Sequence, residues 1–110
     1  MPKFAIFFTY NGDSIAAMLE HPTDRQAEAR RAVESIGGRL DAYYWMFGPH
    51  DGLAIVDAPD SATAGAVSLA VGSSGGFSRL ETHELIEPGA LAALLQKAKH
   101  ARANYRAPSE

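Results

Sequence analysis

The sequence predicts a single α+β domain built around a four-stranded antiparallel sheet, and three observations support this. Four short segments rich in aromatic and β-branched residues alternate with segments of helical periodicity. The length of 110 residues is close to the usual size of one domain. The hydrophobic share of 46% and the charged share of 21% are typical of a folded globular protein. We therefore expect one hydrophobic core.

The first strand is predicted over Lys3 to Tyr10, and it ends at the turn-forming triplet Asn11-Gly12-Asp13. Both of its faces are apolar, as in a central strand that is covered on both sides. One face carries Phe4, Ile6 and Phe8, and the other carries Ala5, Phe7 and Thr9.

After a polar connection containing His21-Pro22, the capping-box spacing of Thr23-Asp24-Arg25-Gln26 predicts a helix that starts at Thr23. Gly37-Gly38 supplies the positive φ that ends this helix. Its buried stripe is predicted to contain Ala29, Ala32, Val33 and Ile36. A second strand follows from Arg39 to Phe47. We expect Tyr43, Trp45 and Phe47 on one of its faces and Tyr44 and Met46 on the other.

The turn at residues 47–52 is expected to use Gly52 in the left-handed region at its exit. A third strand, Leu53 to Ala58, is again apolar on both faces. Asp60 is the predicted N-cap of a helix that runs to Val71 and stops at Gly72. The more polar segment Phe77 to Ile86 is predicted as an edge strand. Glu87-Pro88 opens a last helix.

This order is the βαββαβ plan of a ferredoxin-like fold with an extra C-terminal helix. We expect the domain to span residues 1–100 and residues 101–110 to form a frayed tail. Two crossover helices cover only one face of the sheet, yet the central strands are apolar on both. A dimeric α+β barrel, formed by two copies of the chain, would cover the second face. Partial cover by the C-terminal helix is the alternative.

The net charge and the lack of cysteine exclude several classes of binding partner and of reaction. The formal net charge of −3 gives no electrostatic basis for binding nucleic acid or a membrane, and we expect neither as a partner. The lack of cysteine excludes disulfides and thiolate chemistry and fits a reducing compartment. The apolar run Phe4–Phe8 is too short for a signal peptide or a membrane span, so a cytoplasmic location is expected.

Four motifs carry a resemblance to a known family. They are Gly48-Pro49-His50-Asp51-Gly52, Ile55-Val56-Asp57-Ala58-Pro59-Asp60, Leu69-Ala70-Val71-Gly72-Ser73 and Arg79-Leu80-Glu81-Thr82-His83-Glu84-Leu85. With them the chain resembles the GYD-domain family over most of its length. The resemblance implies a ferredoxin-like fold and a dimer. The tyrosine to which the family name refers corresponds to His50 here. Related barrel families include cofactor-free oxygenases, isomerases, haem-degrading enzymes and ligand-sensing modules, so the fold alone does not select an activity.

In this topology the exit of the first strand, the turn before the third strand and the entry to the fourth strand meet at one end of the sheet. Candidate site residues gathered there are Tyr10, Asn11, His50, Asp51 and Arg79. An imidazole beside a carboxylate is a simple acid/base pair, so His50 and Asp51 are the candidate catalytic residues. In the alternative reading Pro49, Asp51 and Gly52 shape the turn and His50 is solvated.

Aromatic and polar side chains elsewhere extend this candidate site. The predicted substrate-binding residues are Tyr10, Tyr44, Trp45, Arg79 and His83. Alternatively, Tyr43, Tyr44 and Trp45 belong to the core or a dimer interface, and His83 is solvated. Histidines 21, 50, 83 and 100 lack the close pairing of a metal site, and no metal or cofactor is expected.

Two glycine-rich or basic segments have simpler explanations than ligand binding. Gly72 to Gly76 follows a helix and lacks the lysine of a phosphate-binding loop, so we interpret it as a helix stop. Lys97, Lys99, His100 and Arg102 complement the dipole at the C-terminal end of the last helix; an anion-binding patch is the alternative.

Two main functional hypotheses follow. The first is a metal-free enzyme that acts on a small aromatic or carbonyl-bearing molecule, with His50 and Asp51 transferring a proton. The second is a non-catalytic ligand-binding or assembly module. A haem-binding protein is a more distant third.

Overall fold

A computed structural model describes residues 1–109 of the chain. Its elements follow in the order β1 (Lys3–Tyr10), α1 (Gly12–Glu20), α2 (Arg25–Ser35), β2 (Arg39–Trp45), β3 (Gly52–Asp57), α3 (Ser61–Gly72), β4 (Phe77–Leu85), the 3-10 turn η1 (Pro88–Ala90) and α4 (Leu91–Ala103). All four strands form one antiparallel sheet in the order β2-β3-β1-β4. The predicted ferredoxin-like α+β fold is therefore confirmed, with β4 at an edge.

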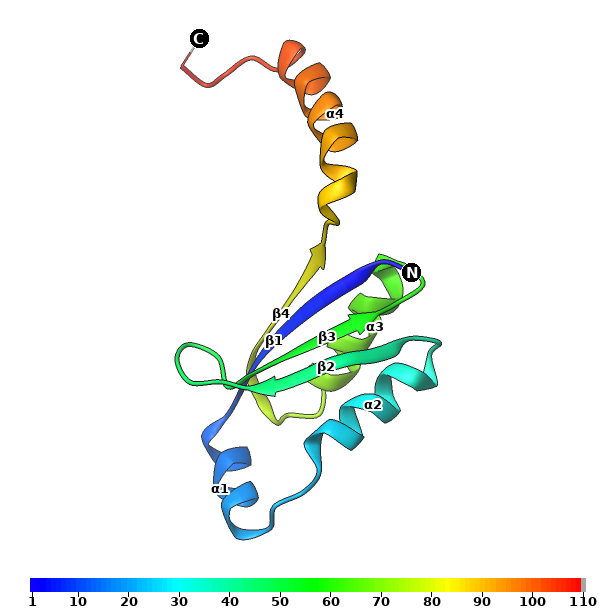
Figure 1. Cartoon of the computed structure of the whole chain (residues 1–110). Coiled ribbons are helices and arrows are strands. Elements are labelled where there is room, and N and C mark those ends of the chain that lie inside the picture. The colour runs from blue at the N-terminus through cyan, green and yellow to red at the C-terminus, as the bar shows by residue number, and fades with distance from the viewer. Residues whose placement is uncertain (110) are drawn as a thin grey trace.

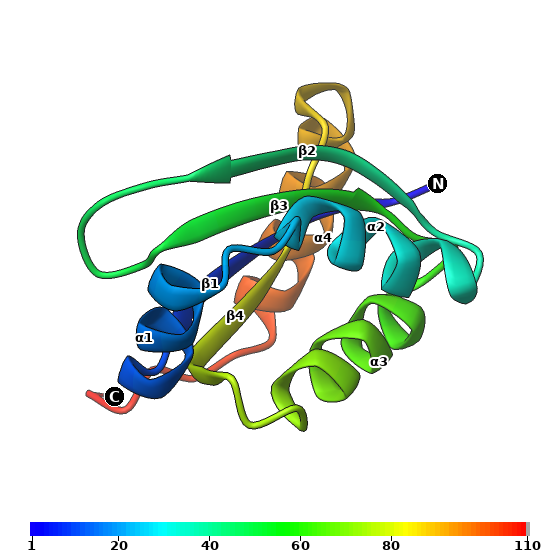
Figure 2. The ribbon, with the colours of Figure 1, turned by 90° about the horizontal axis from the view of Figure 1, so that it is seen from below.

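The core lies between this sheet and helices α2 and α3, which cover one of its faces (Figures 1 and 2). Every second side chain of β1 points into it, as the alternation of a β-strand requires. The cluster of buried hydrophobic residues consists of Phe4, Ile6, Phe8, Tyr10, Val33, Leu40, Ala54, Val56, Ala58, Ala64 and Val67. Ile36, expected in the buried stripe of the first long helix, is exposed because α2 ends at Ser35.

Local interactions explain where the helices begin. The Asp60 side chain caps α3 by accepting from the backbone N–H of Thr63 at 2.8 Å, as predicted. In α2 the capping residue is Asp24, which accepts from Ala27 N at 3.0 Å, so the prediction of Thr23 was wrong by one residue. Helix α1 was not predicted. Its cap is Asn11, whose side chain accepts from Ser14 N at 2.9 Å.

The β2–β3 connection also differs from expectation. Strand β2 ends at Trp45, and Phe47 is fully exposed in the loop. Gly48, with φ of 125°, takes the positive φ that was expected at Gly52. Gly52 is needed for another reason, since an added Cβ would overlap the ring of Phe8.

Helix α4 leaves the second face of the sheet uncovered. It continues from the end of β4 away from the rest of the molecule (Figure 1), and none of its residues is buried. The molecule consequently measures 57 × 34 × 22 Å. The alternative interpretation, in which the C-terminal helix covers part of this face, is therefore wrong for the described residues. None of the helices within residues 1–109 has the length and apolar character needed to cross a membrane.

Candidate functional site

The three segments expected to meet at one end of the sheet do meet there. The backbone N–H of Tyr10 donates to the Asp51 carboxylate at 2.9 Å, and the N–H of Asp51 donates to the carbonyl of Phe8 at 2.8 Å. At the entry to β4, the N–H of Asn11 donates to the carbonyl of Gly76 at 3.0 Å. These bonds tie the β2–β3 turn and the start of β4 to the end of β1.

The side chains of His50 and Asp51 have separate partners. Asp51 accepts from the backbone of Tyr10, whereas Nδ1 of His50 lies 3.2 Å from the hydroxyl of Thr9 and its Nε2 lies 3.6 Å from Glu81 Oε2. The hydroxyl of Thr9 donates to the Pro49 carbonyl at 3.0 Å, so its oxygen is available to accept from Nδ1. The carboxylate that faces the imidazole is therefore that of Glu81.

Glu81 is the centre of a polar group that we call the Glu81 cluster, which consists of Thr9, His50, Arg79, Glu81 and His83. Its carboxylate lies 2.5 Å from Arg79 Nη2 and 3.4 Å from His83 Nε2. The hydrogen bond from His83 and the charge of Arg79 lower the pKa of Glu81, against the opposing effect of burial. The register explains the cluster, because Arg79 and Glu81 lie opposite Thr9 and Phe7 of β1. The i, i+2 spacing of Arg79, Glu81 and His83 could have indicated it from the sequence.

A second charged group, the Asp57 row, consists of Lys3, Arg39, Asp41 and Asp57. Asp57 is only 5% exposed and lies opposite both Lys3 and Arg39 in the sheet register. Its carboxylate accepts from Lys3 Nζ at 2.8 Å and from Arg39 Nη2 at 2.7 Å. The hydrogen bond from Lys3, followed by that from Arg39, lowers the pKa of Asp57, although burial acts in the opposite direction.

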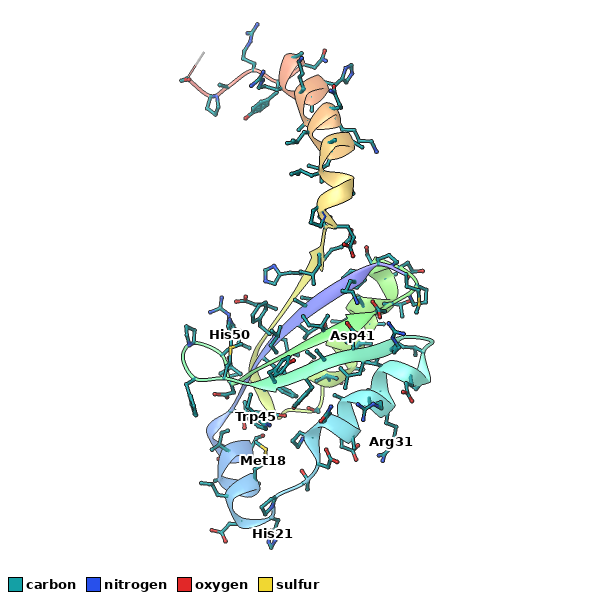
Figure 3. The ribbon with its side chains drawn as sticks, viewed as in Figure 1. Met18, His21, Arg31, Asp41, Trp45 and His50 are labelled. Atoms are coloured by element: carbon teal, nitrogen blue, oxygen red, sulfur yellow. The ribbon has the colours of Figure 1, made fainter. Side chains whose placement is uncertain are left out.

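These two charged groups border an apolar surface that we call the open face. It lies on the side of the sheet opposite α2 and α3, and register places on it Ala5, Phe7, Ala42, Tyr44, Leu53 and Ile55. Figure 3 shows His50 of the Glu81 cluster and Asp41 of the Asp57 row toward opposite ends of the sheet. The ring of Phe7 contacts both His50 and His83, with centroids 5.4 and 5.7 Å apart. The open face therefore has an apolar centre with charged ends.

On the helix side of the sheet there is a cavity of about 230 Å³, which we call the helix-side cavity. Its wall is lined by Ile6, Phe8, Tyr10, Arg25, Glu28, Ala29, Val33, Leu40, Tyr43, Ala54, Val56, Val67, Ser68, Val71, Ser74, Phe77 and Leu80. Tyr10 stacks between Trp45 and Phe77, with ring centroids 5.6 and 4.5 Å away. Burial, followed by the neighbouring hydroxyl of Tyr10, raises the pKa of Tyr43, which keeps its phenol protonated.

The sheet separates the residues that sequence reasoning assigned to one substrate site. Tyr10 and Trp45 belong to the helix side, whereas Tyr44, Arg79 and His83 lie on the open face with His50. Sequence reasoning did not identify Arg25 or Glu81 as site residues. Within residues 1–109, no group of three His, Asp or Glu side chains is arranged to hold a metal ion.

Comparison with known proteins gives a family match and a curated relative. The sequence model of the GYD domain matches residues 4–95. A protein of Thermus thermophilus, named glutamine synthetase and cystathionine beta-lyase binding protein, is 32% identical over 76 residues. The matched region covers 68% of this chain and 79% of that protein.

Two solved structures share the fold. TTHA0845 of Thermus thermophilus superposes with a TM-score of 0.54 at 19% identity, over 79% of this chain and 95% of that one. Hypothetical protein PHS023 of Pyrococcus horikoshii superposes with a TM-score of 0.51 at 10% identity, over 82% and 95% of the two chains. At these identities the similarity concerns the fold alone.

Proposed function

The chain belongs to the GYD-domain family, and from this premise we propose that it is a homodimeric protein-binding module without catalytic activity of its own. The observation that carries the proposal is the open face. The central strands present apolar side chains there, and no helix of the described chain covers them.

The make-up of the open face favours a second copy as its cover. An apolar centre with charged groups at its border is the usual anatomy of a stable protein interface. Two such sheets packed face to face would enclose the side chains of Phe7, Leu53 and Ile55 in a layer about 10 Å thick. Since both partners would use the same surface, a closed two-fold dimer results.

Helix α4 extends the proposed interface. A helix of 13 residues is marginal in water without tertiary contacts, and Leu91, Leu94 and Leu95 are exposed on it. The positive charge of α4 and the segment after it complements the negative charge of residues 1–90, which we call the body. Residues 91–109 contain four of the ten Lys and Arg residues and no acidic residue, whereas residues 1–90 hold twelve of the thirteen acidic residues. We place α4 of each copy against the acidic body of the other.

The name of the Thermus relative supports a protein as the further partner, because it describes that protein as binding two enzymes. We therefore propose that the dimer binds a metabolic enzyme of the glutamine synthetase or cystathionine beta-lyase type. Binding of either purified enzyme from the same organism to the immobilised full chain would support this part. Failure of both to bind would overturn it without affecting the dimer.

The dimer is tested by light scattering of the full chain at micromolar concentration. The mass of two chains is expected for the wild type and for Leu69→Lys, a control on the exposed side of α3. Ile55→Lys and Tyr44→Lys place a charge on the open face and are expected to give the mass of one folded chain. Because Tyr44 is exposed in the single chain, its replacement does not disturb the core. A wild type of single-chain mass, or a dimeric Tyr44→Lys variant, would overturn the proposal.

The second candidate is a metal-free enzyme, and the contact between His50 and Glu81 favours it. The side chain of His50 is only 15% exposed, and its Nε2 faces a carboxylate, as in many proton-transfer pairs. In this candidate Glu81 takes the part that we expected for Asp51. Turnover of a small aromatic or carbonyl compound, lost in His50→Ala, would establish the enzyme in place of the module.

A further inference from the structure

We infer that the helix-side cavity is a binding site for a small monocarboxylic acid with an aromatic or branched aliphatic body. This site lies on the opposite side of the sheet from the open face, so it goes beyond the proposed function and does not depend on it. Three features support this inference. The cavity has an apolar wall, the cationic side chain of Arg25 lines it, and a second cavity meets it at Arg25.

The wall of the helix-side cavity is suited to an apolar group. Aliphatic side chains from the sheet and from both helices line it, among them Ile6, Val33, Leu40, Val56 and Val67. Phe8, Tyr43 and Phe77 add aromatic walls, and Phe8 makes ring contacts with both of the others, at centroid distances of 5.5 and 6.0 Å. A largely apolar wall with a few polar groups is typical of small-molecule sites.

Arg25 supplies the charge that selects an acid. It is half-buried at the first turn of α2 and lines the cavity. Among residues 1–109 its side chain has one hydrogen-bond partner, the hydroxyl of Thr23 at 3.3 Å, and no carboxylate within ion-pair distance. A guanidinium offers five N–H donors, so most of them are free for a ligand carboxylate. Tyr43 lines the same cavity and adds a polar group to its wall.

The one acidic residue in the wall does not cancel this charge. The carboxylate of Glu28 binds Arg31 through both oxygens, at 2.9 and 3.0 Å. Arg31 lies one turn further along α2, so Glu28 is neutralised locally. Among the residues that line the cavity, the charge left for a ligand is therefore that of Arg25.

A second cavity, of about 290 Å³, meets the first at the same place. The two share the lining residues Tyr10, Arg25, Ser74 and Phe77. The second cavity is bordered by α1 and by the connection to α2, including Ser14, His21 and Thr23. Figure 3 shows Met18 and Trp45 at this end of the molecule. A carboxylate held at Arg25 would thus lie at the junction, with its apolar body in the first chamber.

The size of the chamber limits the ligand. Pockets that hold drug-sized molecules have volumes of roughly 300–1,000 Å³, and the helix-side cavity, at about 230 Å³, is smaller. A phenyl or branched alkyl group with one carboxylate matches both the volume and the charge.

The test uses the fluorescence of Trp45, the one tryptophan of the chain, which stacks on Tyr10 at the edge of the site. The full chain is titrated with phenylacetate and with isovalerate. Phenylacetamide lacks the charge and acetate lacks the body, so these two compounds are the ligand controls. Saturable binding of phenylacetate or isovalerate is expected, with phenylacetamide and acetate at least about tenfold weaker, the loss expected for one charge-assisted hydrogen bond.

Arg25→Gln is expected to weaken acid binding by at least about tenfold. Arg30→Gln, on the exposed side of the same helix, is the matched control and is expected to leave binding unchanged. Neither variant alters the open face, so both keep the mass of the wild type. Two results would overturn the inference: no saturable binding of either acid at millimolar concentration, or equal binding by wild type and Arg25→Gln.

Discussion

Removing the charge of the nearly buried Asp57 is expected to destabilise the fold far more than removing an exposed or half-exposed charge of the sheet. The substitution Asp57→Asn keeps the size of the side chain but takes the carboxylate from between Lys3 and Arg39. These two cations lie on neighbouring strands, directly opposite Asp57 in β1 and β2. The carboxylate therefore links three of the four strands.

The expected loss of unfolding free energy in Asp57→Asn depends on how buried Asp57 and its two partners are. A hydrogen bond to a charged group contributes about 1.5–3 kcal/mol to stability. Asp57 makes such bonds to both cations and is nearly buried, but the side chain of Arg39 is 66% exposed, so water screens part of the interaction. We expect Asp57→Asn to lower the free energy of unfolding by about 2 kcal/mol. The control is Asp41→Asn, whose 41% exposed carboxylate binds the same lysine, and its cost is about 0.5 kcal/mol.

The effect also has a definite pH dependence. Because the folded-state pKa of Asp57 is lower than its unfolded value of 3.8, the carboxylate stabilises the folded state at pH values above 3.8. This contribution is lost as the pH falls through the folded-state pKa. The difference between wild type and Asp57→Asn should thus be complete at neutral pH and shrink in acid.

Urea unfolding followed by Trp45 fluorescence measures both effects. All proteins are compared at the same chain concentration, because dissociation of the proposed dimer would contribute to the measured stability. The expected loss lowers the urea midpoint by about 1–2 M at neutral pH. The reasoning would be refuted if Asp57→Asn cost no more than Asp41→Asn, or if its cost stayed constant from neutral pH down to about pH 3.

Two further predictions concern the core and α4. Gly52→Ala adds a Cβ that overlaps the ring of Phe8 and should cost about 2–3 kcal/mol in urea unfolding, whereas Gly65→Ala, in open space on α3, should be neutral or stabilising; equal stability of the two variants would contradict this. Replacing Leu94 and Leu95 with Ser removes the apolar stripe of α4, so sedimentation analysis should show a dimer dissociation constant at least about tenfold higher. An unchanged constant would place α4 outside the interface.

Local sequence patterns were sufficient to predict features that arise from interactions between neighbouring residues. The run of aromatic and branched residues, ended by the turn-forming triplet Asn11-Gly12-Asp13, identified the bounds Lys3–Tyr10 of β1, because strand preference and turn formation depend on adjacent residues. Asp60 and Gly37 were correctly predicted as a helix cap and a helix end, since capping and positive φ involve only adjacent backbone groups. The order of these elements then led to the ferredoxin-like topology.

The composition of the candidate sites depended on contacts between distant segments. The direction of the His50 ring is decided by Thr9 and Glu81, from β1 and β4, and not by the adjacent Asp51. Arg25 became a candidate ligand residue only because α2 and α3 enclose a cavity against the sheet. No spacing along the chain contains that information.

By itself, the sequence determined the four strands with their approximate bounds, the cap of α3 at Asp60, and the presence of apolar side chains on both faces of β1 and β3. Only the tertiary structure decided which of these faces receives the helices and which stays open. The physical reason is the distance along the chain over which the interactions act. Strand alternation and helix capping arise between neighbouring residues, whereas the packing of helices on a sheet face depends on contacts between segments far apart in the sequence. Helix α4, with its exposed leucines, makes no such contact with the sheet face and points away from it.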